Sequence, residues 1–445
     1  MATNDRFRHP GLVIAGSFLA AIALGTVLLS LPVATEAGER ATVMEALFTS
    51  TSAVCVTGLV VVDTATYWST FGEVVILVLI QLGGLGIMTV ASLTLVLLSR
   101  RLGLRARLIA AAQTRALTVR DVGRVVRNVT IFAIACEIVV AAILTVRFLR
   151  TTDMGFGDAL YYGVFHAISA FNNAGFGLYA DSLTRFVGDA WIMLTVAGAV
   201  IVGGLGFPVI FELAKTWRKP KSWSVTTRVT VWVTVVLLVV GTIALAFVEH
   251  DNPDTLGALP PNTRLLAAFF SSVMPRTAGF NAIDIGAMTP EGLFFTDFLM
   301  FIGGGTAGTA GGIKVTTFGL LAVVVWAELR GEDRVNVGPR QIPPDNQRQA
   351  LAVVLVSVLL VAVSAFVLLA ETSLAFEEVL FEVVSAFGTV GLSTGITTDL
   401  PGPGQLLLVV LMFVGRIGPI TLASALALRQ RGRRYELPME RINVG

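Results

Sequence analysis

Val56-Thr57-Gly58-Leu59 is a short turn built around one glycine, and three similar turns follow along this 445-residue chain. Each of the others also runs from an apolar segment into a single glycine followed by an apolar residue: Asn173-Ala174-Gly175-Phe176, Thr277-Ala278-Gly279-Phe280 and Thr389-Val390-Gly391-Leu392. Their glycines lie 104 to 117 residues apart, so the sequence repeats with a period of about 110 residues. One polypeptide with four such units can surround a central axis, as four separate subunits do in an ion channel.

The composition is that of an integral membrane protein. Hydrophobic residues make up 55% of the chain, charged residues only 14%, and the mean hydropathy is +0.80. Soluble domains carry about a quarter charged residues, so this chain is expected to lie in lipid. No stretch is polar enough to form a separate soluble domain.

Basic residues gather in particular loops. They crowd residues 100–127, 215–228 and 429–434, and the chain also starts with Arg6 and Arg8. By the positive-inside rule these segments are cytoplasmic, whereas residues 35–45, 249–261 and 397–404 face outward. Arg147 and Arg150 oppose this pattern at an outward helix end. The sequence therefore predicts a multi-pass protein of the cytoplasmic membrane with both termini inside.

Each unit reads as an outer helix, a half-helix too short to span, a turn and an inner helix. The predicted outer helices are 12–31, 129–149, 229–248 and 350–370. The half-helices are 42–53, 158–171, 262–273 and 375–387, and the inner helices are 71–99, 190–214, 292–329 and 405–428. This predicts an all-α membrane protein with eight spans and four re-entrant pore helices. The repeats would occupy 1–110, 111–220, 221–345 and 346–434, with a cytoplasmic tail at 435–445.

The four turns suit the selection of a monovalent cation. Non-helical backbone at membrane depth is tolerated only where it lines water or is buried in protein, and rings of carbonyl oxygens can replace an ion's hydration shell. Glycine permits the positive φ that turns carbonyls inward, and the C-terminal ends of the half-helices favour cations. The predicted ion-binding residues are Val54, Cys55, Val56, Thr57, Gly58, Asn172, Asn173, Ala174, Gly175, Thr277, Ala278, Gly279, Thr389, Val390 and Gly391.

A glycine-rich stretch interrupts the third inner helix. Since each glycine costs about 1 kcal/mol relative to alanine in a helix, a loop is expected just below the filter. The predicted gate residues in this stretch are Gly303, Gly304, Gly305, Thr306, Ala307, Gly308, Thr309, Ala310, Gly311, Gly312 and Lys314. A kink for close helix packing is the alternative. Lys314 can also simply mark where the helix resumes.

Arg416 lies between Gly415 and Gly418 in the fourth inner helix. A charge at membrane depth is costly and marks a functional site by default. We expect Arg416 to face the pore, to donate hydrogen bonds to carbonyls of the loop and to act as part of the gate. Snorkelling to the inner interface is the alternative.

These turns, the glycine-rich break and Arg416 resemble the Trk/Ktr/HKT superfamily of potassium transporters over essentially the whole chain. Within it the sequence is most similar to the KtrB branch, the membrane subunits of bacterial Ktr systems, because it lacks the extra N-terminal helix pair of the TrkH branch. The resemblance implies a homodimer with one pore per protomer. It also implies potassium at the filter carbonyls, no other cofactor in this chain, and sodium as a candidate activating or coupling ion. Gly58 resembles the potassium-selective type, because plant relatives with serine there prefer sodium.

No nucleotide-binding glycine motif follows a strand anywhere in the sequence, and there is no Walker motif. The resemblance therefore implies a separate cytosolic KtrA-like ring that binds ATP or ADP and drives the gate. The basic loops and residues 435–445 would be its docking surface or part of the dimer contact, although basic loops more often only orient a membrane protein. No nucleic-acid partner is expected.

Two other functional classes fit the sequence less well. A carrier with alternating access also uses broken midplane helices, but it usually has inverted repeats, whereas these units share one orientation. An intramembrane enzyme would need a catalytic pair at depth, and the chain has only His9, His166 and His250 and no Gly-x-Ser-x-Gly elbow. We expect His166 to be a packed histidine, Cys55 and Cys136 to form no disulfide, and the protein not to be an enzyme.

Overall fold

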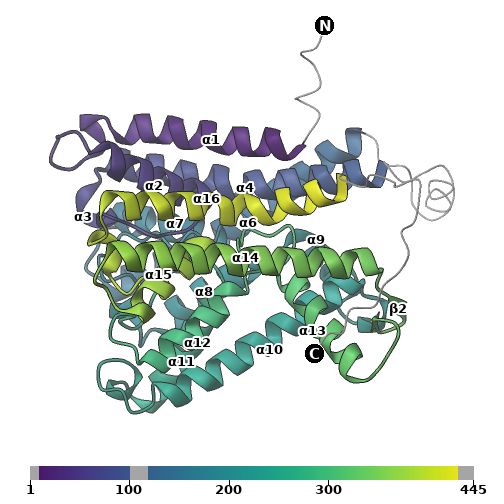
Figure 1. Cartoon of the computed structure of the whole chain (residues 1–445). Coiled ribbons are helices and arrows are strands. Elements are labelled where there is room, and N and C mark those ends of the chain that lie inside the picture. Colours follow the sequence, from purple (N-terminus) through teal and green to yellow (C-terminus); the bar gives the residue numbers. More distant parts are fainter. Residues whose placement is uncertain (1–9, 101–118, 429–445) are drawn as a thin grey trace, which may run out of the picture.

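The computed structural model describes residues 10–100 and 119–428, and these form a helical bundle with one short hairpin (Figure 1). The all-helical class predicted from the sequence is confirmed. Long helices occur at the predicted outer positions: α1 (Pro10–Leu29), α6 (Val119–Thr151), α10 (Val225–Val248) and α14 (Pro344–Glu371). Each is followed by a short helix that ends at a glycine turn: α2 (Val43–Cys55), α7 (Phe156–Phe171), α11 (Pro261–Val273) and α15 (Phe376–Gly388).

Inner helices then run back through the bundle: α4 (Thr70–Arg100), α8 (Ala190–Leu205) with α9 (Phe207–Thr216), α12 (Pro290–Phe301) with α13 (Val315–Leu329), and α16 (Gly402–Leu428). The connections hold only short elements: η2 (Pro32–Ala34), α3 (Thr64–Tyr67), η3 (Thr184–Phe186), η4 (Pro220–Ser222), η5 (Leu256–Ala258), β1 (Asn336–Val337), β2 (Arg340–Gln341) and η6 (Ile396–Thr398). β1 and β2 pair antiparallel.

Local sequence signals explain where the short helices begin. Thr42 and Glu45 form a capping box at the start of α2, in which the Glu45 side chain accepts from the Thr42 N–H at 2.7 Å and the Glu45 N–H donates to Thr42 Oγ1 at 3.3 Å. Proline occupies the first turn of α11, where a missing N–H costs nothing. The short helices are therefore specified at their starts, and the glycine turns end them.

Two inner helices are interrupted. The expected break in the third is present, since α12 ends at Phe301 and α13 begins at Val315. The prediction of one continuous helix over 190–214 is wrong, because α9 leaves α8 at an angle of 99°. Gly206 at the corner has φ 88°, a conformation that glycine adopts freely, and Pro208 lacks the N–H that a continuous helix needs.

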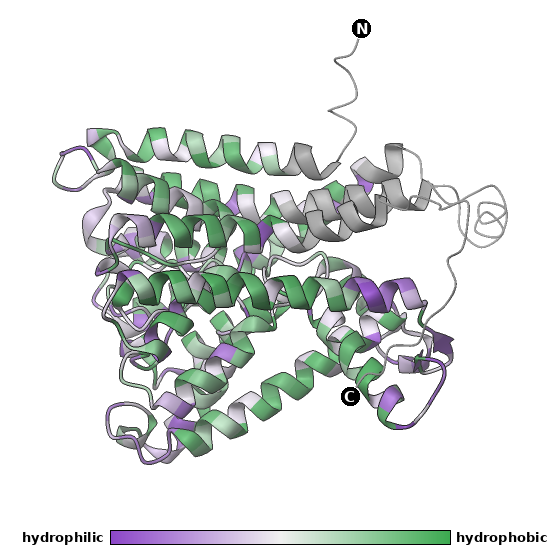
Figure 2. Cartoon of the chain, viewed as in Figure 1, coloured by the Kyte–Doolittle hydropathy of each residue, from purple (hydrophilic) through white to green (hydrophobic). Residues whose placement is uncertain are grey.

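Three of the described helices are long and apolar enough to cross a membrane: Val126–Thr151 of α6, α10 and α14. The bent pair α8–α9 makes a fourth if it is taken as one span. The described apolar parts of α1, α4 and α16 are each shorter than 18 residues. Eight spans therefore stay a prediction. Figure 2 shows apolar residues along the long helices and polar residues gathered at the two ends of the bundle.

The helices close into a ring that follows the order of the chain. α4 packs against α6 and α7, α8 against α11, and α12 against α15. The last helix, α16, contacts α2 and α1, beside which it lies in Figure 1. The fourth unit therefore meets the first, and a central site can be enclosed by one polypeptide.

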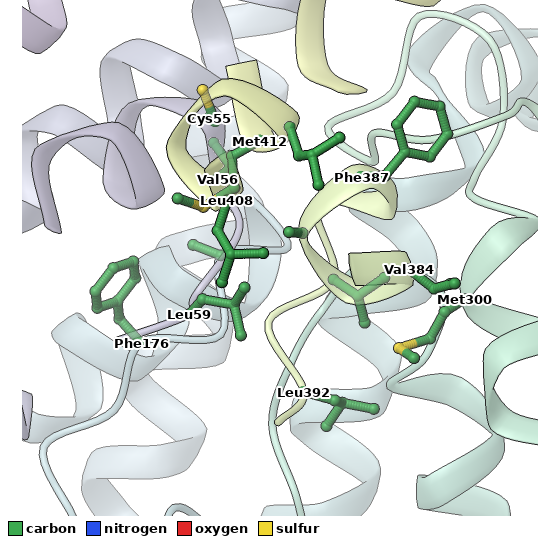
Figure 3. Close-up of a cluster of buried hydrophobic side chains, with 14 of the residues drawn as sticks. Cys55, Val56, Leu59, Phe176, Met300, Val384, Phe387, Leu392, Leu408 and Met412 are labelled. Atoms are coloured by element: carbon green, nitrogen blue, oxygen red, sulfur yellow. The ribbon is translucent and has the colours of Figure 1, made fainter. Parts of the chain in front are cut away.

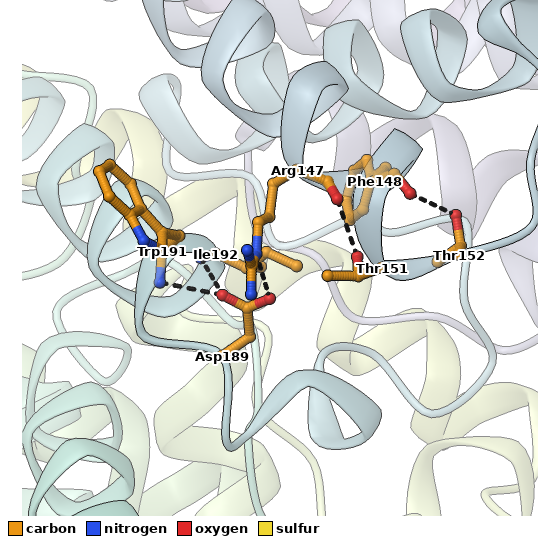
Figure 4. Close-up of polar contacts among 7 residues, drawn as sticks. All are labelled: Arg147, Phe148, Thr151, Thr152, Asp189, Trp191 and Ile192. Carbon is orange, nitrogen blue, oxygen red and sulfur yellow. Dashed lines mark hydrogen bonds and ion pairs between the residues drawn. The ribbon is translucent and has the colours of Figure 1, made fainter.

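The two ends of the bundle differ in charge. At the end with the β1–β2 hairpin, Arg228 donates to the carbonyl of Lys221 (3.5 Å) and lies against Gly338, so two basic loops meet there. At the opposite end Arg147, an exception to the charge pattern, pairs with Asp189 at 2.6 Å (Figure 4). Asp189 also caps α8 by accepting from two backbone N–H groups. Arg147 is therefore neutralised locally.

Candidate ion filter and gate

The four glycine turns meet in a closed ring. A Cβ added to each filter glycine would collide with the carbonyl oxygen of the residue that precedes the next filter glycine. The distances to that oxygen are 2.4 Å from Gly58 to Ala174, 2.8 Å from Gly175 to Ala278, 2.5 Å from Gly279 to Val390 and 2.1 Å from Gly391 to Thr57. The fourth turn thus returns to the first, and only glycine fits at each contact.

Each turn has the same alternating backbone. Its first and third residues have positive φ, and the residue between them does not. The φ values are 55° and 92° for Val56 and Gly58, 59° and 73° for Asn173 and Gly175, 70° and 71° for Thr277 and Gly279, and 51° and 95° for Thr389 and Gly391. Since opposite signs of φ alternate, successive carbonyls can share one side of the strand, which is the geometry an oxygen-lined ion path needs.

Three turns leave their short helices through the same hydrogen bond, in which the residue after the left-handed position donates five residues back. Its N–O distance is 2.8 Å in the pairs Thr57–Ser52, Ala174–Ser169 and Val390–Ser385. In the third turn Ala278 instead donates to Met274 at 3.0 Å. Glycine usually occupies the left-handed position of such a helix end. Val56 and Thr389 are β-branched there, so these turns carry strain of about 1–3 kcal/mol each.

Several buried oxygens at the turns have no partner among the described residues. They are the hydroxyls of Thr57, Thr277 and Thr389 and the side-chain oxygen of Asn172. Buried polar atoms are normally paired with protein or water. Oxygen atoms are the ligands that hard monovalent cations take from proteins, so the donor set around the turns fits such an ion.

Glycines of the inner helices seat these turns. A Cβ on Gly83 would lie 2.0 Å from the carbonyl oxygen of Val54. A Cβ on Gly203 would lie 1.9 Å from the carbonyl oxygen of Phe171, and one on Gly415 would lie 1.9 Å from that of Phe387. These carbonyls lie at or near the last turns of the short helices α2, α7 and α15. In the third unit Gly303 instead faces Gly311 of its own loop, at 2.1 Å. The third unit is therefore the one in which the inner-helix glycine does not contact the short helix of its own unit.

Residues 302–314, called here the glycine loop, fold across the second and fourth units. The N–H groups of Gly305 and Thr309 donate to the carbonyls of Gly204 (2.7 Å) and Gly203 (3.1 Å). A Cβ on Gly311 would lie 1.9 Å from Thr389 Oγ1, so the loop also touches the fourth turn. The two ends of the loop are joined by a hydrogen bond of 2.8 Å from the Gly303 N–H to the carbonyl of Ile313.

Arg416 is buried, with 2% of its surface exposed, and it points at the glycine loop. Its Nη1 donates to the carbonyl of Thr309 and its Nη2 to that of Gly83 at 3.4 Å. The expected hydrogen bond to a loop carbonyl is thus present, and Arg416 does not snorkel. Lys314 directly precedes α13 and donates to the carbonyl of Ala310 at 2.5 Å, so it both marks the helix start and contacts the loop.

The sequence reasoning missed Arg276, the residue immediately before the third turn. It is 7% exposed, and its Nη2 donates to the carbonyl of Gly303 at 3.2 Å. Its other terminal nitrogen has no partner among the described residues. The sequence could have pointed to Arg276, because no other turn has a charged residue at the corresponding position.

Two buried carboxyl groups behind the turns were also missed. Glu137 of α6 accepts from Gln81 Nε2 (3.0 and 3.2 Å) and from Asn172 Nδ2 (3.1 Å). Glu382 of α15 accepts from the hydroxyls of Ser393 (2.8 Å) and Thr397. Glu137 lies in an otherwise apolar part of its helix, which is the pattern that singled out Arg416, whereas Glu382 shares α15 with Glu377 and Glu378. Glu137 and Glu382 support the second and fourth turns from behind.

Apolar packing holds the turns in place. Leu59, Phe176 and Leu392, which follow three of the filter glycines, are buried. Figure 3 shows Leu59 and Leu392 among side chains of several units, with Leu408 and Met412 of α16 beside Val56. Because this surround is close-packed, the turns cannot shift without disturbing several helices.

Beyond the second turn, Arg185 and Asp181 form an ion pair of 2.6 Å, and the Arg185 guanidinium lies 4.6 Å from the ring centre of Tyr179. The hydrogen bonds that Arg185 donates to the Asp181 carboxylate raise the pKa of Arg185, which therefore stays charged. His166 is buried, and its Nδ1 lies 2.8 Å from the carbonyl of Tyr162, as expected for a packed histidine. Cys55 and Cys136 are both free, as expected.

Known proteins match this chain over nearly its whole length. A family model described as TrkH, cation transport protein, matches residues 2–432. The chain is 40% identical to the Ktr system potassium uptake protein B of Bacillus subtilis, covering 95% of this chain and 94% of that protein. It is 40% identical to the protein of the same name from Vibrio alginolyticus, with coverage of 93% and 90%. It is 35% identical to the potassium/sodium uptake protein NtpJ of Enterococcus hirae, with coverage of 98% and 97%.

The fold has a counterpart among solved structures. The crystal structure of the potassium transporter TrkH from Vibrio parahaemolyticus aligns with a TM-score of 0.69 at 21% identity. The alignment covers 94% of this chain and 85% of that one. The family model and the relatives, which extend over nearly all of the sequence, show that the chain belongs to the TrkH family of cation transport proteins.

Proposed function

We propose that this chain is a potassium uptake transporter in which the four glycine turns form the ion filter and the glycine loop forms the gate. The observation that carries the proposal is the closed ring of turns, in which every filter glycine faces a carbonyl of the next unit. A ring of backbone oxygens can replace the hydration shell of a monovalent cation. The filter ligands are the ion-binding residues predicted from the sequence.

The surroundings of the ring favour a cation. The four short helices run toward the turns with their partly negative C-terminal ends, and threonine hydroxyls without protein partners add oxygen atoms. Relatives are named as potassium uptake proteins, and one as a potassium/sodium uptake protein. Potassium is therefore the proposed main cargo, and sodium is proposed as a coupling or activating ion.

The gate is proposed from the position of the glycine loop. It touches the second and fourth units, and Arg416 adds a buried positive charge beside it. Such a charge opposes the passage of cations, so conduction requires the loop and Arg416 to separate or shift. The fourfold ring selects, and the third and fourth units open and close the path.

The assembly is proposed from the names of the relatives. Two of them are proteins of a "Ktr system", which implies a system of several components. We propose a homodimer in the cytoplasmic membrane, with both termini inside and a KtrA-like nucleotide-binding ring on the cytoplasmic face. Residues 435–445, proposed as part of the docking surface, lie outside the described residues.

Flux through purified protein in liposomes tests the gate. Arg416→Ala is expected to raise potassium flux by about tenfold or more, because a hydrogen bond from a charged group is worth about 1.5–3 kcal/mol. Arg150→Ala, which removes an exposed arginine of α6, is the matched control and is expected to keep wild-type flux. Wild-type flux in Arg416→Ala at normal expression would remove the gate assignment.

Growth tests the cargo. The wild-type chain is expected to rescue a potassium-uptake-deficient bacterium at low potassium, more strongly when the partner ring is co-expressed. Failure with and without the ring, together with the absence of potassium flux in liposomes, would contradict the proposed function.

A further inference from the structure

Asn173, the first residue of the second filter turn, is bonded to two other parts of the molecule. Its Nδ2 donates to the carbonyl of Arg276, directly before the third turn, at 3.3 Å. Its Oδ1 accepts from the hydroxyl of Thr309 in the glycine loop at 3.0 Å. Asn173 is 1% exposed and Thr309 is fully buried. One planar amide therefore connects two filter turns and the loop.

Thr309 is the loop residue with the densest set of bonds. Its N–H donates to Gly203 O at 3.1 Å, and its hydroxyl also approaches Phe171 O at 3.3 Å. Its carbonyl accepts from Arg416. The hydrogen bonds that hold the loop in place thus converge on the same residue that is bonded to the filter.

The corresponding first residues of the other turns make no such link. Val56 has no polar side-chain atom, and the hydroxyls of Thr277 and Thr389 have no partner in the described part of the chain. The amide of Asn173 is also confined, because Cβ positions on Gly203 and Gly204 would lie 3.0 and 3.3 Å from its oxygen and nitrogen. Glycine at both positions leaves just enough space for it.

We propose that Asn173 is a positioning residue that couples the glycine loop to the ion selectivity of the filter. When the loop moves away, the buried Oδ1 of Asn173 loses the Thr309 hydroxyl. A buried acceptor without a partner is costly, so the amide turns to find another donor. Its Nδ2 then releases the carbonyl of Arg276, and the third turn loosens.

The coupling rests on the proposed function and deepens it, because it assigns the link between the proposed filter and gate. Linkage between two sites acts in both directions. A cation that orders the third turn therefore holds Asn173 in place and favours the bonded position of the loop. Selective conduction therefore requires Arg416 to leave the carbonyl of Thr309 while the hydroxyl of Thr309 stays bonded to Asn173.

Thr309→Val tests the coupling, because valine keeps the shape of threonine and the backbone bonds of residue 309 but removes the hydroxyl. Flux of potassium and of sodium is measured in liposomes. Thr309→Val is expected to lower the potassium-to-sodium flux ratio by about fivefold or more, the lower end of typical coupling between sites. Thr309→Ser, which keeps the hydroxyl, is expected to retain the wild-type ratio. Thr309→Ala, also without the hydroxyl, gives the same reading if the valine variant does not fold.

Thr296→Val is the matched control. Thr296 of α12 is also a buried threonine, but its hydroxyl donates to the carbonyl of Gly292 at 2.8 Å, outside the turns and the glycine loop. This variant is expected to keep the wild-type ion ratio. A drop equal to that of Thr309→Val would show that the loss of any buried threonine hydroxyl alters the ratio, and it would overturn the role of Asn173.

A double-mutant cycle separates the coupling from a general effect of the loop. Asn173→Gly suits the φ of 59° and removes both amide bonds. It is expected to lower the ion ratio by itself, and Thr309→Val is expected to add no further change in this background. An unchanged ratio in Thr309→Val, or an equal drop with and without Asn173, would overturn the proposal. Potassium flux in the wild type, measured in the same assay, shows separately whether the proposed function holds.

Discussion

At the scale of single residues, the proposed filter depends on glycines that face backbone atoms of another unit. A side chain in the way can rotate, but a carbonyl held by its own turn cannot. The distance from each missing Cβ to that carbonyl therefore sets how much a substitution disturbs the ring, from 2.1 Å at Gly391 to 2.8 Å at Gly175. The four glycines occupy equivalent places in the sequence, but they differ in how well each would tolerate a side chain.

Alanine substitutions of the filter glycines are expected to follow this order. Gly391→Ala should reduce potassium uptake most, Gly58→Ala and Gly279→Ala less, and Gly175→Ala least. Gly395→Ala is the control, since Gly395 has φ 102° but no atom within 4 Å of its Cβ position. The Gly395→Ala variant has the backbone strain of a positive φ but no steric clash, so it separates the two effects. Uptake by cells that lack other potassium transporters gives the measurement, and equal losses in Gly391→Ala and Gly395→Ala would contradict the order.

Glu137→Gln is expected to lower both stability and potassium selectivity. Gln81 and Asn172 both donate to the Glu137 carboxylate, and an amide there would turn a donor toward other donors. Leaving a buried group unpaired costs about 1–3 kcal/mol. Glu249→Gln is the control, since Glu249 is buried and accepts from Thr255 (2.7 Å) and Thr289 (2.7 Å) in loops outside the turns. The thermal unfolding temperature should fall in both variants, whereas the potassium-to-sodium flux ratio should fall only in Glu137→Gln.

At the scale of elements, the bend between α8 and α9 and the glycine loop fit each other. A Cβ on Gly206 would lie 2.4 Å from the carbonyl oxygen of Thr306, so the corner touches the loop directly. The helix turns aside at the point where the loop crosses it. The second and third units are thus shaped as a pair.

Gly206→Ala is expected to displace the glycine loop and raise potassium flux in liposomes severalfold. The added methyl group meets a loop carbonyl, and alanine at φ 88° is itself strained. Gly198→Ala in the same α8 helix has no atom within 4 Å of its Cβ position and is expected to leave flux unchanged. Reduced flux in Gly206→Ala would indicate that the loop is pressed further into the path instead.

The sequence predicted the elements better than the contacts between them. The short helices and the break in the third inner helix were predicted because length and glycine content are local signals. The bend at Gly206 was missed, because an apolar run reads as one helix unless the loop that crosses it is known. Glu137 and Gln81 are 56 positions apart, and no local pattern pairs them. The role of Arg416 as a loop contact was accessible because a charge in an apolar helix needs a partner.

At the scale of the whole molecule, the basic loop at 215–228 lies at the end of the bundle with the β1–β2 hairpin, and the Arg147–Asp189 pair lies at the opposite end, which predicts the orientation in the membrane. Lys219→Cys, in the basic loop 215–228, is expected to react with an impermeant thiol reagent only from the cytoplasmic side. Asp254→Cys, beyond α10, is expected to react from outside. Both positions are exposed, and Cys55 is fully buried. Labelling of intact cells and of inverted vesicles makes the measurement, and the reverse pattern would contradict the predicted orientation.

The contact of α16 with α1 and α2 also bears on how the protein is made. α16, the last helix of the ring, is the last to leave the ribosome. Until it arrives, Thr57 and Gly279, which face the fourth turn, have no neighbour on that side. Polar backbone left facing lipid is costly, so a chain that stops before residue 391 is expected to be degraded rather than to form a leak. The order of the units along the chain is therefore expected to leave no partly made product that leaks ions.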